Sequence, residues 1–196
     1  MRTARGSGIQ IGQIEGNESR YRLLIRRSAI HRRGVFALES IPRNHRVIEY
    51  TGAHMRLREA KRLQRRLRRL GKPLNVYLGV LSPGWVIDGS AGGNGAQFIN
   101  HCCDPNLGVR RMRGHVLFFS KRRIHAGDEL TVDYRYDKNE KATHCRCGSP
   151  KCRGTMYSRE WMARMRRKEA RKKKAVATLE ARMRNYLPRE TTIGLE

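Results

Sequence analysis

Between Tyr21 and Tyr136, apolar residues occur in short runs separated by polar, Gly-containing segments. Short runs bounded by turn-forming residues are typical of β-strands. We expect strands at Tyr21–Arg26, Arg46–Tyr50, Trp85–Asp88, Gly108–Met112, His115–Ser120 and Glu129–Asp133. Arg113-Gly114 separates two of these runs and predicts a tight hairpin turn. The pattern favours a mainly β fold with some α, a folded β-clip, over a doubly wound parallel sheet.

Two segments have helical periodicity instead. From Arg56 to Leu70, apolar residues recur every three or four positions, the other positions are nearly all basic, and Gly71-Lys-Pro73 is a stop signal. Residues 158–187 have the same spacing and contain the basic run Arg164–Lys174. We expect the first helix to pack its apolar face on the core and to expose its basic face.

These patterns divide the chain into four parts. We expect a flexible arm over residues 1–20, a β domain over 21–137 with the helix inserted in it, a cysteine-containing segment over 141–157, and a basic helical extension over 158–196. The sequence shows no internal repeat.

The net charge of the chain restricts which classes of molecule it is expected to bind. Its 196 residues include 43 Lys and Arg against 17 Asp and Glu, a formal net charge of +26. Such a field attracts polyanions, so we expect nucleic acid or a nucleic-acid-bound protein to bind the helices at 56–70 and 158–187. No run approaches the about 20 apolar residues of a membrane span, and no apolar run after Arg5 predicts an export signal. We therefore expect no membrane partner and an intracellular site, either nucleus and chromatin or the bacterial cytoplasm and nucleoid.

The cysteines indicate a metal. Three lie close together in Cys145-Arg-Cys147-Gly-Ser-Pro-Lys-Cys152, and two are adjacent at Cys102 and Cys103. Clustered cysteines without an export signal indicate metal ligands rather than disulfides. A structural Zn²⁺ needs four ligands in a tetrahedron, so the cluster of three predicts a fourth from Cys102 or Cys103, with His144 as a competing ligand.

Several motifs, in order, resemble SET domains over about residues 22–156. Residues 100–106 (Asn-His-Cys-Cys-Asp-Pro-Asn) resemble the family signature Asn-His-Ser-Cys-x-Pro-Asn, and residues 123–134 resemble the second signature. Residues 145–152 resemble the zinc-binding post-SET segment, and residues 33–37 the glycine turn that opens the domain. Glu49-Tyr-Thr-Gly52 and Val86-Ile-Asp88 with Gly93-Asn94 also match. The resemblance implies a knot-like crossing of the Asn100 and Tyr134 segments at the active site.

The family implies an S-adenosylmethionine-dependent protein-lysine N-methyltransferase. Carried over by motif, the cofactor-binding residues are Arg32, Arg33, Gly34, Val35, Phe36, Tyr77, Asn100 and His101. The turn at Gly34 is expected to bring backbone close to the cofactor. The resemblance implies that a single zinc binds Cys103, Cys145, Cys147 and Cys152. Cys102 is then not a zinc ligand.

Three tyrosines are implied to act on the substrate. Tyr134 matches the residue that orients the amine and the methyl group, and Tyr50 and Tyr136 are expected to line the lysine channel. Positioning of the two reactants would then supply much of the catalysis. Where the family often has Phe or Tyr before Asp133, this chain has Val132, which suggests a pocket able to go beyond monomethylation.

Other interpretations of the residues remain open. Asp88, Asp133 and Asp137 are expected to be structural, and Trp161 has either a structural role or one in covering the cofactor pocket. The expected substrate is a basic, nucleic-acid-associated protein such as a histone or histone-like protein. A second hypothesis is a zinc-stapled nucleic-acid-binding module that uses the SET fold as a scaffold. A third is that Lys172–Lys174 is itself methylated.

Overall fold

The computed structural model describes residues 12–14, 19–71, 77–137 and 144–186. These fall into two units, one made of described residues up to 134 together with 144–156, the other of 135–137 and 157–186. None of the helices in these residues has the length and apolar character needed to span a membrane. The expected stop at Lys72-Pro73 and residues 138–143 and 187–196 lie outside the described residues.

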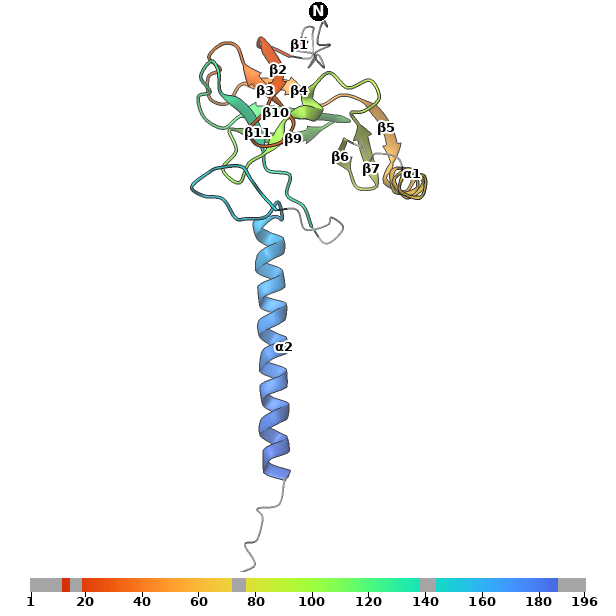
Figure 1. Cartoon of the computed structure of the whole chain (residues 1–196), viewed down its shortest axis with the longest axis vertical. Coiled ribbons are helices and arrows are strands. Elements are labelled where there is room, and N and C mark those ends of the chain that lie inside the picture. Colours follow the sequence, from red (N-terminus) through yellow and green to blue (C-terminus); the bar gives the residue numbers. More distant parts are fainter. Residues whose placement is uncertain (1–11, 15–18, 72–76, 138–143, 187–196) are drawn as a thin grey trace, which may run out of the picture. The chain divides into compact units, whose positions relative to one another are not determined.

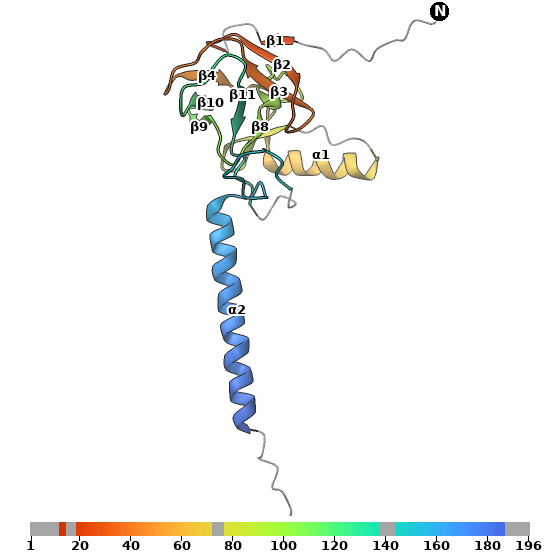
Figure 2. The ribbon, with the colours of Figure 1, turned by 60° about the vertical axis from the view of Figure 1, so that its left-hand side comes forward.

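The first unit consists of three small β-sheets (Figures 1 and 2). The five-stranded sheet has the order β1-β2-β3-β11-β8, and the three-stranded sheets have the orders β4-β10-β9 and β5-β7-β6. The strands are β1 Gly12–Ile14, β2 Leu23–Arg27, β3 Arg33–Ala37, β4 Arg46–Glu49, β5 Ala53–Arg56, β6 Leu78–Ser82, β7 Trp85–Asp88, β8 Asn100–His101, β9 Leu107–Met112, β10 His115–Ser120 and β11 Glu129–Val132. A 3₁₀ turn, η1, spans Ala96–Phe98. The mainly β class is confirmed.

One hairpin shows how local chemistry sets the register. Arg113 and Gly114 both have positive φ, 48° and 82°, as a two-residue hairpin turn with the twist of its strands requires. The turn pairs His115 with Met112 across β9 and β10. Val116 and Phe118, which point to the same face of β10, join the main core cluster at 3% and 5% exposed, and Leu117 between them is also buried.

A parallel pairing brings the two family signatures together. Strand β8 pairs with β11, with Thr131 opposite Asn100 and Val132 opposite His101. Antiparallel pairing of β11 with β3 places Val35 opposite Leu130, and both side chains are fully buried. Three segments that are far apart in sequence are therefore neighbours in space: the start of β3, the pair Asn100-His101 and the segment after β11.

The inserted helix α1, Leu57–Arg69, lies where the periodicity placed it and contacts β5 and β7. Glu59 accepts a hydrogen bond from the Arg56 backbone N–H at 3.1 Å, and Arg66, Arg68 and Arg69 in the last turn suit the negative end of the helix dipole. Its packing is looser than expected. Within α1 only Ala60 is buried, Leu63 is 37% exposed, and Leu70 just beyond the helix is 57% exposed. The basic face is exposed as expected.

Residues 12–14 differ from the expectation of a flexible arm. They form β1, which pairs antiparallel with β2, and the Ile14 side chain is only 7% exposed. Burial of this single isoleucine against the core gives the short segment a reason to be ordered.

The second unit consists mainly of α2, Arg159–Tyr186, as the spacing predicted. The Ser158 hydroxyl accepts the Trp161 N–H at 3.0 Å and caps the helix. Trp161 stacks on Tyr157 with ring centroids 4.1 Å apart. Apolar residues further along α2 are exposed, including Leu179 at 59% and Met183 at 61%.

Candidate active site and cysteine cluster

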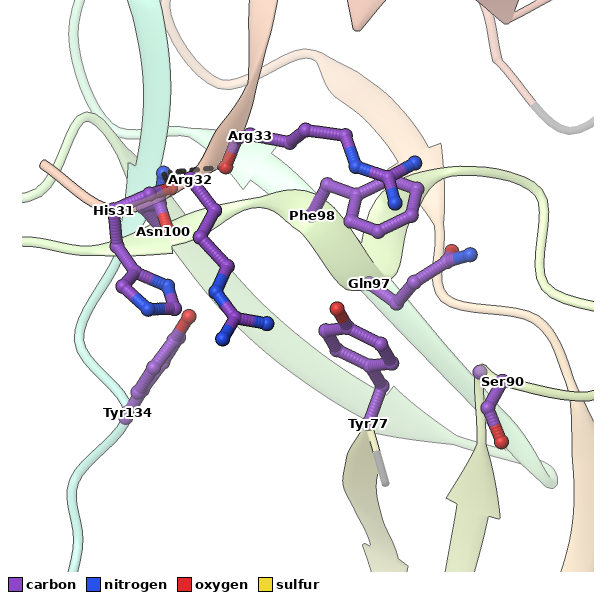
Figure 3. A pocket seen from close by; sticks show the side chains of 10 residues that line it. His31, Arg32, Arg33, Tyr77, Ser90, Gln97, Phe98, Asn100 and Tyr134 are labelled. Atoms are coloured by element: carbon purple, nitrogen blue, oxygen red, sulfur yellow. Dashed lines mark hydrogen bonds between the residues drawn. The ribbon is translucent and has the colours of Figure 1, made fainter. Parts of the chain in front are cut away.

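A cavity of about 380 Å³ opens where β3, β8 and the segment after β11 meet (Figure 3). This volume is in the range of about 300–1,000 Å³ that small-molecule sites occupy. The cavity is lined by His31, Arg32, Arg33, Tyr77, Gly89, Ser90, Gln97, Phe98, Asn100 and Tyr134. Aromatic rings alternate with amide, hydroxyl and guanidinium groups, a lining that can hold a nucleoside and a charged amino-acid group together.

The Asn100 side chain fixes the turn at the cavity wall. Its Nδ2 donates to the backbone oxygens of His31 and Arg33, at 3.3 and 2.9 Å. The same nitrogen lies 2.8 Å from Oε1 of Glu129, a carboxylate that also accepts the Ser28 hydroxyl. Asn100 is 6% exposed, so these bonds are sheltered from water. Asn100 therefore acts on the turn through contacts on both sides of Arg32.

Gly34 makes this arrangement possible in an unexpected way. A Cβ placed on Gly34 would lie 2.2 Å from Glu129 Oε1 and 3.0 Å from the Ser28 Cβ. The close approach at Gly34 is thus to the Glu129 carboxylate, which a Cβ would displace from its bonds to Ser28 and Asn100. Gly34, Val35 and Phe36 are buried in β3 and are not among the residues that line the cavity.

Tyr134 lies on the cavity wall and is held at two points. Its hydroxyl donates to the Ile99 oxygen at 3.0 Å, and its backbone N–H donates to His101 Nδ1 at 3.1 Å. Tyr77 lies on another side of the cavity, with its ring edge-on to Phe98 at 5.5 Å between centroids. The cavity thus places two expected site tyrosines together with Asn100, Arg32 and Arg33.

Tyr50 and Tyr136 lie elsewhere. Tyr50 is buried, and its hydroxyl donates to the Tyr77 oxygen at 2.5 Å, so it supports the Tyr77 segment rather than lining this cavity. Tyr136 belongs to the second unit, where its carbonyl accepts the Ser158 N–H. The channel role of both residues remains a prediction.

His101 is not among the residues that line the cavity, but its ring lies 5.3 Å from that of Tyr134 between centroids. The ring is fully buried, and burial lowers its pKa, although the nearby Asp133 carboxylate acts in the opposite direction. A neutral ring agrees with acceptance of the Tyr134 N–H at Nδ1. Its other nitrogen, Nε2, lies 3.5 Å from the Cys103 sulfur.

Four cysteines converge beside this ring. The sulfur atoms of Cys103, Cys145, Cys147 and Cys152 all lie within 4.8 Å of one another. Cys103 and Cys145 are 3.7 Å apart, too far for a disulfide. Zinc–sulfur bonds of about 2.3 Å in a tetrahedron place sulfurs about 3.8 Å apart, so the spacing fits Zn²⁺.

The thiols of the cluster differ in their electrostatics. Burial raises the pKa of the Cys103 and Cys145 thiols. Burial raises the pKa of the Cys147 thiol, but backbone and thiol hydrogen bonds outweigh it and lower that pKa to about 6. Burial raises the pKa of Cys102 to about 11, and this residue is outside the cluster of four. Among the described residues, His144 is likewise absent from the cluster, and its backbone pairs with Thr155 instead.

The sequence did not single out three features of the site. Glu129 joins Ser28 to Asn100, Arg153 pairs with Asp133 at 2.9 Å, and Gln97 and Phe98 line the cavity. The position of Glu129 within the second signature is the one sequence feature that points to it. No sequence feature points to Arg153, because an Arg in a basic segment predicts an exposed side chain.

The chain belongs to the SET domain family, whose profile matches residues 32–135. Among its relatives, the histone-lysine N-methyltransferase set1 of Dictyostelium discoideum is 37% identical over 141 residues. The H3 lysine-4 specific histone-lysine N-methyltransferase of Saccharomyces cerevisiae is 35% identical over 145 residues. Each alignment covers 70% of this chain, but only 9% and 13% of the relatives, respectively. The family resemblance of the motifs is confirmed, over a small part of much longer proteins.

Solved structures agree on the fold. A crystal structure of KRYPTONITE in complex with mCHG DNA and SAH has a TM-score of 0.58 and 30% sequence identity, covering 71% of this chain and 30% of that one. A second KRYPTONITE structure, with mCHH DNA, an H3(1-15) peptide and SAH, has the same TM-score and 29% identity.

Proposed function

We propose that this chain is a protein-lysine N-methyltransferase that uses S-adenosylmethionine and acts on histones or similar basic proteins. The observation that carries the proposal is the convergence of Tyr134, Asn100 and the Arg32 turn on one cavity in a SET domain. The SAH bound to a structural neighbour, and the histone-lysine methyltransferase relatives, support the choice of cofactor and substrate.

The bound cofactor would supply a methyl group on a sulfonium sulfur, which the lysine nitrogen takes up as the carbon–sulfur bond breaks. Lysine has a pKa of about 10.4 in water, so its proton must pass to water before the nitrogen can attack. The positive charges of Arg32 and Arg33 favour the neutral amine near the cavity. The Tyr134 hydroxyl, fixed at the wall, orients the amine for in-line attack.

The cysteine cluster would hold one structural Zn²⁺. The metal would tie Cys103, just after β8, to the segment of Cys145–Cys152 that follows the β domain. Because a structural zinc adds folding free energy, it would stabilise the cysteine-containing segment that lies beside His101. Its contribution is structural, since four thiolates fill the coordination sphere.

The basic helices would bring the enzyme to its substrate on nucleic acid. Helix α1 carries seven Lys and Arg residues against one Glu, and α2 carries eleven against three. A surface this positive repels a free basic peptide but attracts DNA that already holds the substrate. Activity on histones should therefore rise when DNA neutralises them, and chromatin would be the site of action.

The test is transfer of labelled methyl groups to free histones and to histone–DNA complexes, with wild type beside Tyr134→Phe. We expect label on lysine for wild type, more with DNA, and none for Tyr134→Phe, while SAH affinity by calorimetry stays within a few-fold. Absence of label together with absence of SAH binding would overturn the proposal. Strong DNA binding in that case would support the scaffold hypothesis instead.

Charge reversal tests the recruitment step by itself. Arg62→Glu with Arg66→Glu on α1 should weaken DNA binding and flatten its salt dependence, because each phosphate contact contributes a slope of about −0.9 in log affinity against log salt. Activity on a peptide without DNA should remain. Equal rates with and without DNA in wild type would contradict recruitment.

A further inference from the structure

Arg32 has a backbone conformation that most residues avoid. Its φ is 40°, in the left-handed region where a Cβ is crowded. Such a conformation persists only where surrounding contacts enforce it. Here they do, because Asn100 Nδ2 binds the carbonyls of His31 and Arg33, and the Arg32 carbonyl accepts the Ser28 N–H at 3.1 Å. Glycine or asparagine would fit this position with less strain, so the backbone alone does not explain an arginine.

The side chain offers an explanation. Figure 3 shows Arg32 extending into the cavity, with Tyr134 and Tyr77 on the facing walls. The neighbouring Arg33 differs, because its guanidinium lies 4.4 Å from the Phe98 ring centroid. Within the part of the chain that the structure describes, Arg32 has neither an ion pair nor a ring contact. Its five N–H donors are thus available to a ligand in the cavity.

The charges of the cavity restrict what that ligand group can be. The ten lining residues include two guanidinium groups and no carboxylate. The proposed cofactor carries two positive charges, on the sulfonium and the ammonium, and one negative charge, on the carboxylate. An unpaired guanidinium would repel the sulfonium and the ammonium. It would bind the carboxylate through a charge-assisted, bidentate contact, for which a planar guanidinium is suited.

We propose that Arg32 is a cofactor-specificity residue that binds the carboxylate of the adenosyl amino acid and so discriminates against ligands that lack it. This inference rests on the proposed function and deepens it by assigning the recognition of one ligand group to one side chain. The contacts that hold the turn fix the Arg32 backbone at the cavity wall, so the side chain extends into the cavity before the ligand arrives.

The experiment combines a change in the residue with a change in the ligand. Calorimetry would measure the affinities of wild type and Arg32→Asn for SAH and for decarboxylated SAH, which keeps the adenosine, the sulfur and the amine. Asparagine tolerates positive φ and carries no charge, so the fold should persist. We expect Arg32→Asn to lose about 10- to 100-fold in SAH affinity, as for a hydrogen bond to a charged group. Its affinity for decarboxylated SAH should equal or exceed that of wild type.

Two further variants make the result specific. Arg32→Gly should lose SAH affinity to the same extent while its melting temperature stays equal or rises, because glycine accepts the positive φ. Arg33→Ala is the matched control. Loss of its stacking on Phe98 should lower the affinities for SAH and for decarboxylated SAH by similar factors. Equal losses for both ligands in Arg32→Asn, or no loss for SAH, would overturn the inference. Absence of SAH binding to wild type would instead overturn the proposed function.

Discussion

The imidazole of His101 lies 3.5 Å from the sulfur of Cys103, and the opposite nitrogen of the same ring accepts the backbone N–H of Tyr134. One buried side chain therefore contacts both the cysteine cluster and the segment that carries the proposed catalytic tyrosine. Changes in the cluster should reach the cavity through this ring, because buried hydrogen-bonded groups are costly to rearrange.

Removal of the proposed zinc should consequently weaken ligand binding as well as stability. We expect one zinc per chain by elemental analysis, and a strong chelator should lower both the melting temperature and the SAH affinity. Cys103→Ser should have the same effects, because its thiolate is one of the four proposed ligands. Cys102→Ala is the matched control, since Cys102 is adjacent in sequence and lies outside the cluster. Full zinc content in Cys103→Ser would contradict the assignment.

The Asp133–Arg153 ion pair should contribute more to stability than pairs on the surface. Its N–O distance is 2.9 Å, and the two side chains are 23% and 8% exposed, respectively. Asp133→Asn removes the charge that compensates a nearly buried guanidinium, and we expect a loss of about 1–3 kcal/mol in unfolding free energy. The control is Glu169→Gln, which breaks the exposed pair with Lys173 and should cost under about 0.5 kcal/mol. Chemical denaturation measures both, and equal losses would contradict the prediction.

Local pattern predicted much of this fold, because most strands and both helices are long enough to show a period. A turn signal is enough to predict the hairpin at Arg113-Gly114. Apolar residues that recur every three or four positions are enough to predict the helix at 57–69. Strand β1 was missed because three residues are too few for a period. The exposure of Leu63 was also missed, since periodicity identifies an apolar face but not what covers it.

Motif spacing predicted which residues meet at the cavity and in the cysteine cluster better than it predicted their contacts. Asn100, Tyr77, Tyr134 and the four cysteines were all named from motifs, and the structure brings the first three to the cavity and the cysteines to one cluster. The partner of Gly34 was not predicted. Glu129 is 95 positions away in sequence and reaches Gly34 only because β11 pairs with β3. Such long-range approaches come from the sheet register, which no local pattern records.

Gly34→Ala should therefore damage ligand binding through the Glu129 carboxylate. The new Cβ would displace Oε1, and with it the bonds to Ser28 and Asn100 that hold the turn. We expect SAH affinity to fall at least about tenfold and stability to fall by about 1–3 kcal/mol, as when buried polar groups lose partners. Gly108→Ala is the control, because a Cβ there would meet Lys121 at an ordinary 3.5 Å. Similar SAH affinities for the two variants would contradict this account.

The size of residue 132 should determine how many methyl groups the substrate lysine receives. Val132 ends β11, is 7% exposed, and lies two positions before Tyr134, where a larger side chain would take up space near the proposed reaction centre. We expect wild type to add more than one methyl group, as read by intact mass of the substrate, and Val132→Tyr to stop at one. Overpacking a buried site can cost about 1–3 kcal/mol, so the comparison requires a Val132→Tyr protein that still melts cooperatively and binds SAH. Val132→Ile, which adds a single methylene, should retain the wild-type product pattern. Strict single addition by wild type, unchanged in Val132→Tyr, would show that another side chain limits the product.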